Sequence, residues 1–180
     1  MTNQFAQALS ELTAALEAAG IRYAIGGSLA SSTHGLFRAT EDGDIIADLS
    51  PAHASRLAHA LGPAWYADAD EIVSSVRAGR SFNLIHIATA LKFDLFPAVT
   101  DFHAIQLDRA KIMQLRLDGS TPCPVTTAED ILLAKLRWFR DGGEVSERQW
   151  SDVLGIVATA PSLDWQYLNL WAARLGVAAL

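Results

Sequence analysis

The residues of this 180-residue chain that are best suited to chemistry begin with two glycines and a serine: Gly26, Gly27 and Ser28. They follow a short apolar run at residues 23–25, which predicts a buried strand. Small residues at such a turn let backbone N–H groups approach an anion, and the N-terminus of the helix expected over residues 28–34 favours negative charge. The Ser28 hydroxyl can donate to a phosphate, cap that helix, or do both. The pattern predicts a phosphate-binding turn.

Two carboxylates, Asp42 and Asp44, stand at i and i+2 in a second expected strand. Side chains alternate along a strand, so both carboxylates project from the same side, a few ångströms apart and roughly a dozen residues after the phosphate-binding turn. Like charges held this close repel each other unless a cation lies between them or one of them takes up a proton. Carboxylate oxygens are the ligands that Mg²⁺ prefers, so the pattern predicts a magnesium site.

A third carboxylate, Asp94, lies in the second of two further expected strands, residues 82–87 and 90–96. In that strand Lys92, Asp94 and Phe96 share one face. If the strand pairs with the one that carries Asp42 and Asp44, three carboxylates meet at one point. Three acids beside a phosphate-binding turn are suited to a metal-bound triphosphate.

Together these motifs resemble the nucleotidyltransferase superfamily, whose fold is that of DNA polymerase β. The segments HGLFRATEDGD at residues 34–44 and TTAEDILLAKL at residues 126–136 are similar to the small bacterial branch that contains the AbiEii-like abortive-infection toxins. The resemblance extends from about residue 21 to residue 175. Gly43 departs from it, because relatives usually carry an apolar residue between the two acids; the acid spacing is kept.

The resemblance implies an α+β fold: a small, strongly twisted mixed sheet flanked by helices, with a helical pack at the C-terminus. The expected division is a catalytic core at residues 1–121 and a helical subdomain at residues 122–180, with a single domain as the alternative. The active site would lie between these two parts.

The resemblance also implies the chemistry. An NMP unit would pass from an NTP to a hydroxyl of an RNA, a protein or a small molecule, with two Mg²⁺ ions, or Mn²⁺ as an alternative. The residues expected to hold the metal and to act in catalysis are Asp42, Asp44 and Asp94, with Asp94 as general base or as a ligand that orients the nucleophile. The residues expected to bind the nucleotide are Gly26, Gly27, Ser28, Arg38 and Lys135. For a member of the toxin-like branch we also expect an antitoxin protein as a partner.

Two of these side chains have alternative roles. Arg38 can reach a phosphate or pair with Glu41. Lys135 lies in an apolar helix, where it can point into the cleft toward the triphosphate or extend outward to solvent.

Composition limits the classes of protein to consider. Apolar residues make up 51% and charged residues 19% of the chain, as in an ordinary globular protein, and no apolar run approaches the roughly 20 residues that span a bilayer. The N-terminus has no basic segment of a signal peptide, and the single Cys123 excludes an internal disulfide; both favour a cytoplasmic protein. The net charge of −6 argues against general nucleic-acid binding, but not against an RNA end docking at a local basic patch.

Two other hypotheses compete with the enzyme. The fold could be kept without turnover, as a module that binds a nucleotide or a protein partner, although such a module has no need for three repelling carboxylates. Alternatively, the acidic trio could be coincidental in a structural protein.

Three further patterns give structural expectations. Asp68, Asp70 and Glu71 fit the first turn of a helix better than a metal cluster. Residues 122–124, Pro-Cys-Pro, predict a rigid link, and Thr126 with Glu129 predicts a capping box at the start of the next helix.

Overall fold

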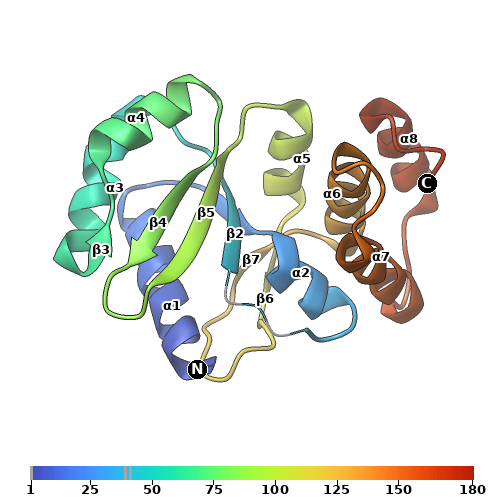
Figure 1. Cartoon of the computed structure of the whole chain (residues 1–180), viewed down its shortest axis with the longest axis horizontal. Coiled ribbons are helices and arrows are strands. Elements are labelled where there is room, and N and C mark those ends of the chain that lie inside the picture. Colours follow the sequence, from blue (N-terminus) through green and yellow to red (C-terminus); the bar gives the residue numbers. More distant parts are fainter. Residues whose placement is uncertain (1, 39, 41) are drawn as a thin grey trace.

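A computed structural model describes residues 2–38, 40 and 42–180 (Figure 1). The α-helices are α1 (Thr2–Ala18), α2 (Gly27–His34), α3 (Ala54–Leu61), α4 (Ala69–Arg77), α5 (Asp101–Arg109), α6 (Ala128–Asp141), α7 (Glu147–Thr159) and α8 (Trp165–Leu175). The strands are β1 (Tyr23–Ile25), β2 (Asp42–Ala47), β3 (Trp65–Tyr66), β4 (Phe82–His86), β5 (Leu91–Pro97), β6 (Lys111–Met113) and β7 (Cys123–Val125). Two short 3-10 helices, η1 (Pro51–His53) and η2 (Gly62–Ala64), flank α3.

The seven strands form one mixed sheet in the order β3-β4-β5-β2-β1-β7-β6. β2 lies at its centre, where it pairs antiparallel with β1 and parallel with β5. Alternate residues of β5 are buried, and Phe93 and Leu95 are completely enclosed, while Lys92, Asp94 and Phe96 are partly open on the other face. The face assignment made from the sequence is therefore confirmed, and the acids point away from the core.

Helices lie on both sides of this sheet. α1 packs against α3, and the buried Leu12, Leu16, Leu57 and Phe93 belong to the main core. On the other side of the molecule α6, α7 and α8 form the C-terminal pack, and α6 and α7 both contact α2 (Figure 1). The helix that begins at the Gly-Gly-Ser turn is thus held between the sheet and the C-terminal pack.

A buried carboxylate, Asp130, ties the start of α6 to its surroundings. It accepts hydrogen bonds from the Thr127 hydroxyl at 2.8 Å and from the Tyr167 hydroxyl of α8 at 2.5 Å, and Arg109 at the end of α5 lies 3.4 Å away. The N-cap of α6 is Thr127, whose hydroxyl accepts from the Asp130 backbone N–H. The expected cap at Thr126 is wrong by one residue: the cap is Thr127, and Thr126 instead donates to the Ile25 carbonyl.

The structure confirms the expected α+β architecture, a mixed sheet flanked by helices with a C-terminal helical pack. The expected link at residues 122–124 is wrong, because Cys123–Val125 is strand β7, which pairs parallel with β1 and antiparallel with β6. Prolines conceal this strand in the sequence, since proline is rare inside a sheet. None of the helices in the described residues combines the length and hydropathy needed to cross a bilayer.

Packing against Phe93 explains why a glycine, Gly43, lies between the two acids. A Cβ added at this position would lie 2.5 Å from Cδ1 and 2.9 Å from Cε1 of the buried Phe93 ring. The ring of Phe93 therefore occupies the space that a side chain at position 43 would need, and the strand keeps its acid spacing.

We predict that Gly43→Ala lowers the free energy of unfolding by about 1–3 kcal/mol through overpacking against Phe93. Urea denaturation of the single variants and of Gly43→Ala/Phe93→Leu would measure it. In the Phe93→Leu background the alanine should cost less, because the smaller side chain leaves room. An equal cost in both backgrounds would contradict the packing explanation.

Candidate active site

Asp44 and Asp94 lie side by side on neighbouring parallel strands. They are register partners in the β2–β5 pairing, and Asp42 is the partner of Lys92. The Lys92 ammonium lies 3.4 Å from an Asp94 carboxylate oxygen. The structure therefore brings Asp94 to the strand that carries Asp42 and Asp44, with a lysine at the edge of the group.

The Gly-Gly-Ser turn contacts Asp44 on the side opposite Asp94. The Gly26 N–H donates to the Asp44 carbonyl at 2.9 Å, and a Cβ on Gly27, whose φ is +52°, would overlap the Asp44 carboxylate. The Ser28 backbone N–H also bonds the Asp44 side chain and favours its ionised form. Only glycine at position 27 lets the turn and the carboxylate come this close.

The environment raises the pKa of Asp44 above its usual value. Burial is the largest cause, and the neighbouring Asp94 and Asp42 add repulsion, while Lys135 and the Ser28 N–H act in the opposite direction. Negative charge is thus concentrated at this point beyond what the nearby groups neutralise, which is the condition that a bound cation would relieve.

The donor set fits a divalent cation that also binds phosphate oxygens. Within the described residues, no three His, Cys, Asp or Glu side chains gather closely enough to hold an ion by themselves. Mg²⁺, however, is usually bound through one or two carboxylates together with substrate phosphates and waters. Asp44 and Asp94, with Asp42 two residues along β2, supply that kind of site next to the Gly-Gly-Ser turn.

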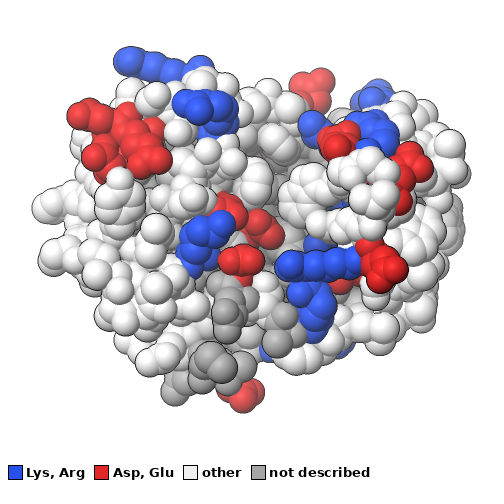
Figure 2. Space-filling view, in the orientation of Figure 1, with Lys and Arg blue, Asp and Glu red and all other residues white. Residues whose placement is uncertain are grey.

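Two guanidinium groups converge on the Ser28 hydroxyl. Arg38 Nη2 donates to Ser28 Oγ at 2.6 Å, and Arg148 Nη2, from α7, donates to the same oxygen at 3.2 Å. Ser28 is buried, and with both lone pairs of its oxygen engaged, its hydroxyl hydrogen is available to an acceptor. On the viewed face, basic side chains lie on both sides of the central acidic group (Figure 2).

A third cation, Lys135 of α6, lies behind these arginines. Its side chain is 1% exposed, and its ammonium pairs with Asp152 of α7 at 2.8 Å; Arg38 Nε lies 3.6 Å from the other oxygen of the same carboxylate. Burial lowers the pKa of Lys135, while Asp152 and Asp44 favour its charged form. Lys135 therefore points inward, and one carboxylate, Asp152, faces two of the three cations.

Arg148 and Asp152 are the two residues of this site that the sequence did not indicate. At i and i+4 they read as an ordinary ion pair along α7. In the structure each reaches a different partner instead: Arg148 reaches Ser28, 120 residues away in sequence, and Asp152 reaches Lys135 and Arg38. The alternative pairing of Arg38 with Glu41 falls on a residue outside the described part of the chain.

The other candidate groups have structural roles. Asp68 is the N-cap of α4 and accepts from the backbone N–H groups of Asp70 and Glu71, as the helix interpretation predicts. Cys123 is buried in β7, and burial raises the pKa of its thiol to about 11, so it is a poor nucleophile.

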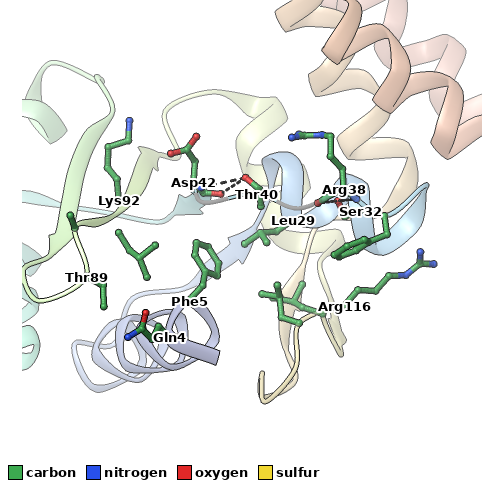
Figure 3. A pocket seen from close by; sticks show the side chains of 15 residues that line it. Gln4, Phe5, Leu29, Ser32, Arg38, Thr40, Asp42, Thr89, Lys92 and Arg116 are labelled. Atoms are coloured by element: carbon green, nitrogen blue, oxygen red, sulfur yellow. Dashed lines mark hydrogen bonds between the residues drawn. The ribbon is translucent and has the colours of Figure 1, made fainter. Parts of the chain in front are cut away.

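Two cavities border the acids. The larger, of about 510 Å³, is bordered by Asp42, Lys92 and Arg38 (Figure 3). The smaller, of about 200 Å³, lies against Asp44 and Gly27, beneath α5 and α6. The carboxylates therefore have room for ligand groups on two sides.

Comparison with known proteins gives structural but no sequence matches: no family model and no curated protein matches the chain. The solution structure of the antibiotic-resistance factor ANT(2'')-Ia, described with substrate-regulated conformation dynamics, superposes with a TM-score of 0.58 at 16% identity, over 99% of this chain and 96% of that one. The crystal structure of ANT(2'')-Ia with adenylyl-2''-tobramycin gives 0.58 at 14% identity, over 97% and 98%. An antigenic nucleotidyltransferase-like protein from Paracoccidioides brasiliensis gives 0.53 at 18% identity, over 95% and 86%.

The protein has the nucleotidyltransferase fold. The likeness extends over nearly the whole chain, so the C-terminal helices belong to it as well as the sheet. At identities of 14–18% the likeness establishes the fold alone.

We predict that Asp44→Asn stabilises the metal-free protein at neutral and higher pH. Because the folded-state pKa of Asp44 is raised, ionisation costs stability once the pH exceeds the unfolded-state pKa, and the full cost is present above the folded-state pKa. Thermal melts in EDTA from pH 3 to pH 8 should therefore show a gain for the variant that grows with pH.

The exposed Asp118→Asn is a suitable control and should show little change across the same range. An Asp44→Asn protein that melts below the wild type at pH 8 in EDTA would show that the carboxylate is not under the repulsion inferred here.

Proposed function

We propose that this protein is a metal-dependent nucleotidyltransferase that moves an NMP unit from an NTP to an acceptor hydroxyl. The observation that carries the proposal is the meeting of two oppositely charged groups at the Gly-Gly-Ser turn. The negative group is Asp44 and Asp94, on one side of the turn. The positive group is Arg38 and Arg148, which both donate hydrogen bonds to the Ser28 hydroxyl oxygen on the other side. A nucleoside triphosphate with its divalent cation is a ligand that needs both.

The basic residues and Ser28 bind the phosphates, and the acidic residues bind the cation and the attacking hydroxyl. Ser28 donates its hydroxyl hydrogen to the β- and γ-phosphates, and Arg38, Arg148 and Lys135 neutralise them. Asp94 accepts the proton of the attacking hydroxyl or orients that hydroxyl. A divalent cation held by Asp42, Asp44 and Asp94 would neutralise charge on the phosphates and lower the pKa of the hydroxyl.

Several finer assignments are hypotheses that follow the resemblance. A role as an AbiEii-like toxin with an antitoxin partner, in a bacterial cytoplasm, is supported by the segments at residues 34–44 and 126–136. The ANT(2'')-Ia complex contains an adenylylated tobramycin, which makes a small-molecule acceptor a second candidate beside RNA and protein. The alternative of an inactive nucleotide-binding module shares the same site and differs only in turnover.

Calorimetric titration of ATP, GTP, CTP and UTP, with and without Mg²⁺, tests the proposal. We expect one or more to bind in the presence of Mg²⁺, Asp44→Asn to abolish the Mg²⁺ dependence, and Arg148→Ala to weaken binding by about tenfold or more, because it removes a charge-assisted contact. Arg56→Ala, on the exposed face of α3, is the control and should bind like the wild type.

Failure of every nucleotide to bind the folded wild type would refute the proposal. Binding without pyrophosphate release in the presence of candidate acceptors would favour the inactive module instead.

A further inference from the structure

The larger cavity lies beside the groups assigned to the triphosphate. Asp42 borders it, and of the groups assigned to the phosphates Arg38 borders it too, whereas Ser28, Lys135 and Arg148 do not. Its floor is apolar, built from Phe5 of α1 with the neighbouring leucines Leu29, Leu91 and Leu115. A hydroxyl held there would lie beside Asp42, next to the donor site that Arg38 shares with this cavity.

The polar rim of this cavity is mainly positive. Among the described lining residues three carry a positive charge, Arg38, Lys92 and Arg116, and Asp42 alone carries a negative one. Figure 3 shows Lys92 on one side, Arg38 and Arg116 on the other, and Asp42 between them. The rim therefore has the charge of a site for an anion.

Arg116 is the cation in this rim that the catalytic group does not use. Lys92 pairs with Asp94, and Arg38 lies against Asp152 and Ser28. Arg116 Nη1 donates to the Gly35 carbonyl at 3.1 Å, which fixes the guanidinium, and no carboxylate of the described residues lies within 4.0 Å of it. Its other N–H groups can therefore bind an incoming anion.

We propose that this cavity holds the acceptor, and that the acceptor is a nucleotide: a hydroxyl compound with a phosphate and a flat base. The apolar floor and the exposed Phe37 ring accommodate the base, while Arg116 binds the phosphate. A polycationic acceptor is disfavoured, because it would meet like charges at the rim.

This inference rests on the proposed function, and the reaction is the same transfer of an NMP unit from an NTP to an acceptor hydroxyl. The acceptor hydroxyl oxygen bonds to the α-phosphorus, and the bond from that phosphorus to the β-phosphate bridging oxygen breaks. Pyrophosphate leaves with the bonding electrons, and the hydroxyl proton passes to Asp94 or to solvent.

The test measures acceptor binding with the donor site already filled. Wild-type protein is saturated with Mg²⁺ and a non-hydrolysable analogue of the tightest-binding NTP, and then titrated with a 5′-mononucleotide, a single-stranded ribo-oligonucleotide with a free 3′-hydroxyl, or an aminoglycoside. We expect a phosphate-bearing ligand to bind and the aminoglycoside not to bind. A preference for the mononucleotide identifies a free nucleotide as the source, and a preference for the oligonucleotide identifies an RNA end.

Charge reversal supplies the matched comparison. Arg116→Glu should weaken binding of the phosphate-bearing ligand by about tenfold or more and leave the affinity for the NTP analogue unchanged. Arg56→Glu makes the same change in net charge on the exposed face of α3 and should affect neither ligand.

If no phosphate-bearing ligand binds the donor-loaded wild type, if Arg116→Glu binds it as well as Arg56→Glu does, or if the aminoglycoside binds more tightly, the inference is overturned. Failure of the NTP analogue to bind the wild type would instead refute the proposed function.

Discussion

The close approach of the Asp44 carboxylate to the Gly-Gly-Ser turn is the constraint on which the rest of the site depends. Asp44 stands between Gly27, whose missing Cβ leaves it room, and Asp94 on the neighbouring strand. Burial, and then repulsion from Asp94 and Asp42, disfavour its charge and raise its pKa. A carboxylate persists in such a position only where the surrounding fold determines its place, and here the central pairing of β2 with β5 and the start of α2 do so.

The same constraint explains why the C-terminal helices are needed. The sheet and the Gly-Gly-Ser turn supply the acids and Ser28, but Lys135 and Arg148 come from α6 and α7, both of which pack against α2. A buried ion pair such as Lys135–Asp152 is weak evidence for stability, because desolvation offsets the attraction of the charges. Its clearer effect is positional: it fixes a cation near Asp44 and beside the arginines that reach Ser28.

Much of this arrangement could be predicted from local sequence patterns. Alternation along residues 90–96 put Lys92, Asp94 and Phe96 on one face, and the strand-turn-helix at Gly26–Ser28 was evident from small residues after an apolar run. Alternation does not reveal which strands pair. The meeting of the three carboxylates depended on the pairing of β5 with β2, and only the tertiary structure shows that pairing. Arg148 and Asp152 were missed for the same reason, since their i, i+4 spacing offers a local pairing that the tertiary contacts replace. β7 was missed because Pro124 lies within it.

The chain as a whole is acidic, whereas the rim of the larger cavity is mainly basic, and this difference has a physical meaning. A net charge of −6 repels polyanions at distances over which the protein acts as a single charge, and salt weakens that repulsion. Arg38, Arg116 and Arg148 act at hydrogen-bond distance, where direct contacts decide binding. The protein is acidic overall but places arginines around one cavity and at Ser28. It is therefore suited to select anions by direct contact with these arginines, and it gains little from non-specific attraction to a nucleic acid.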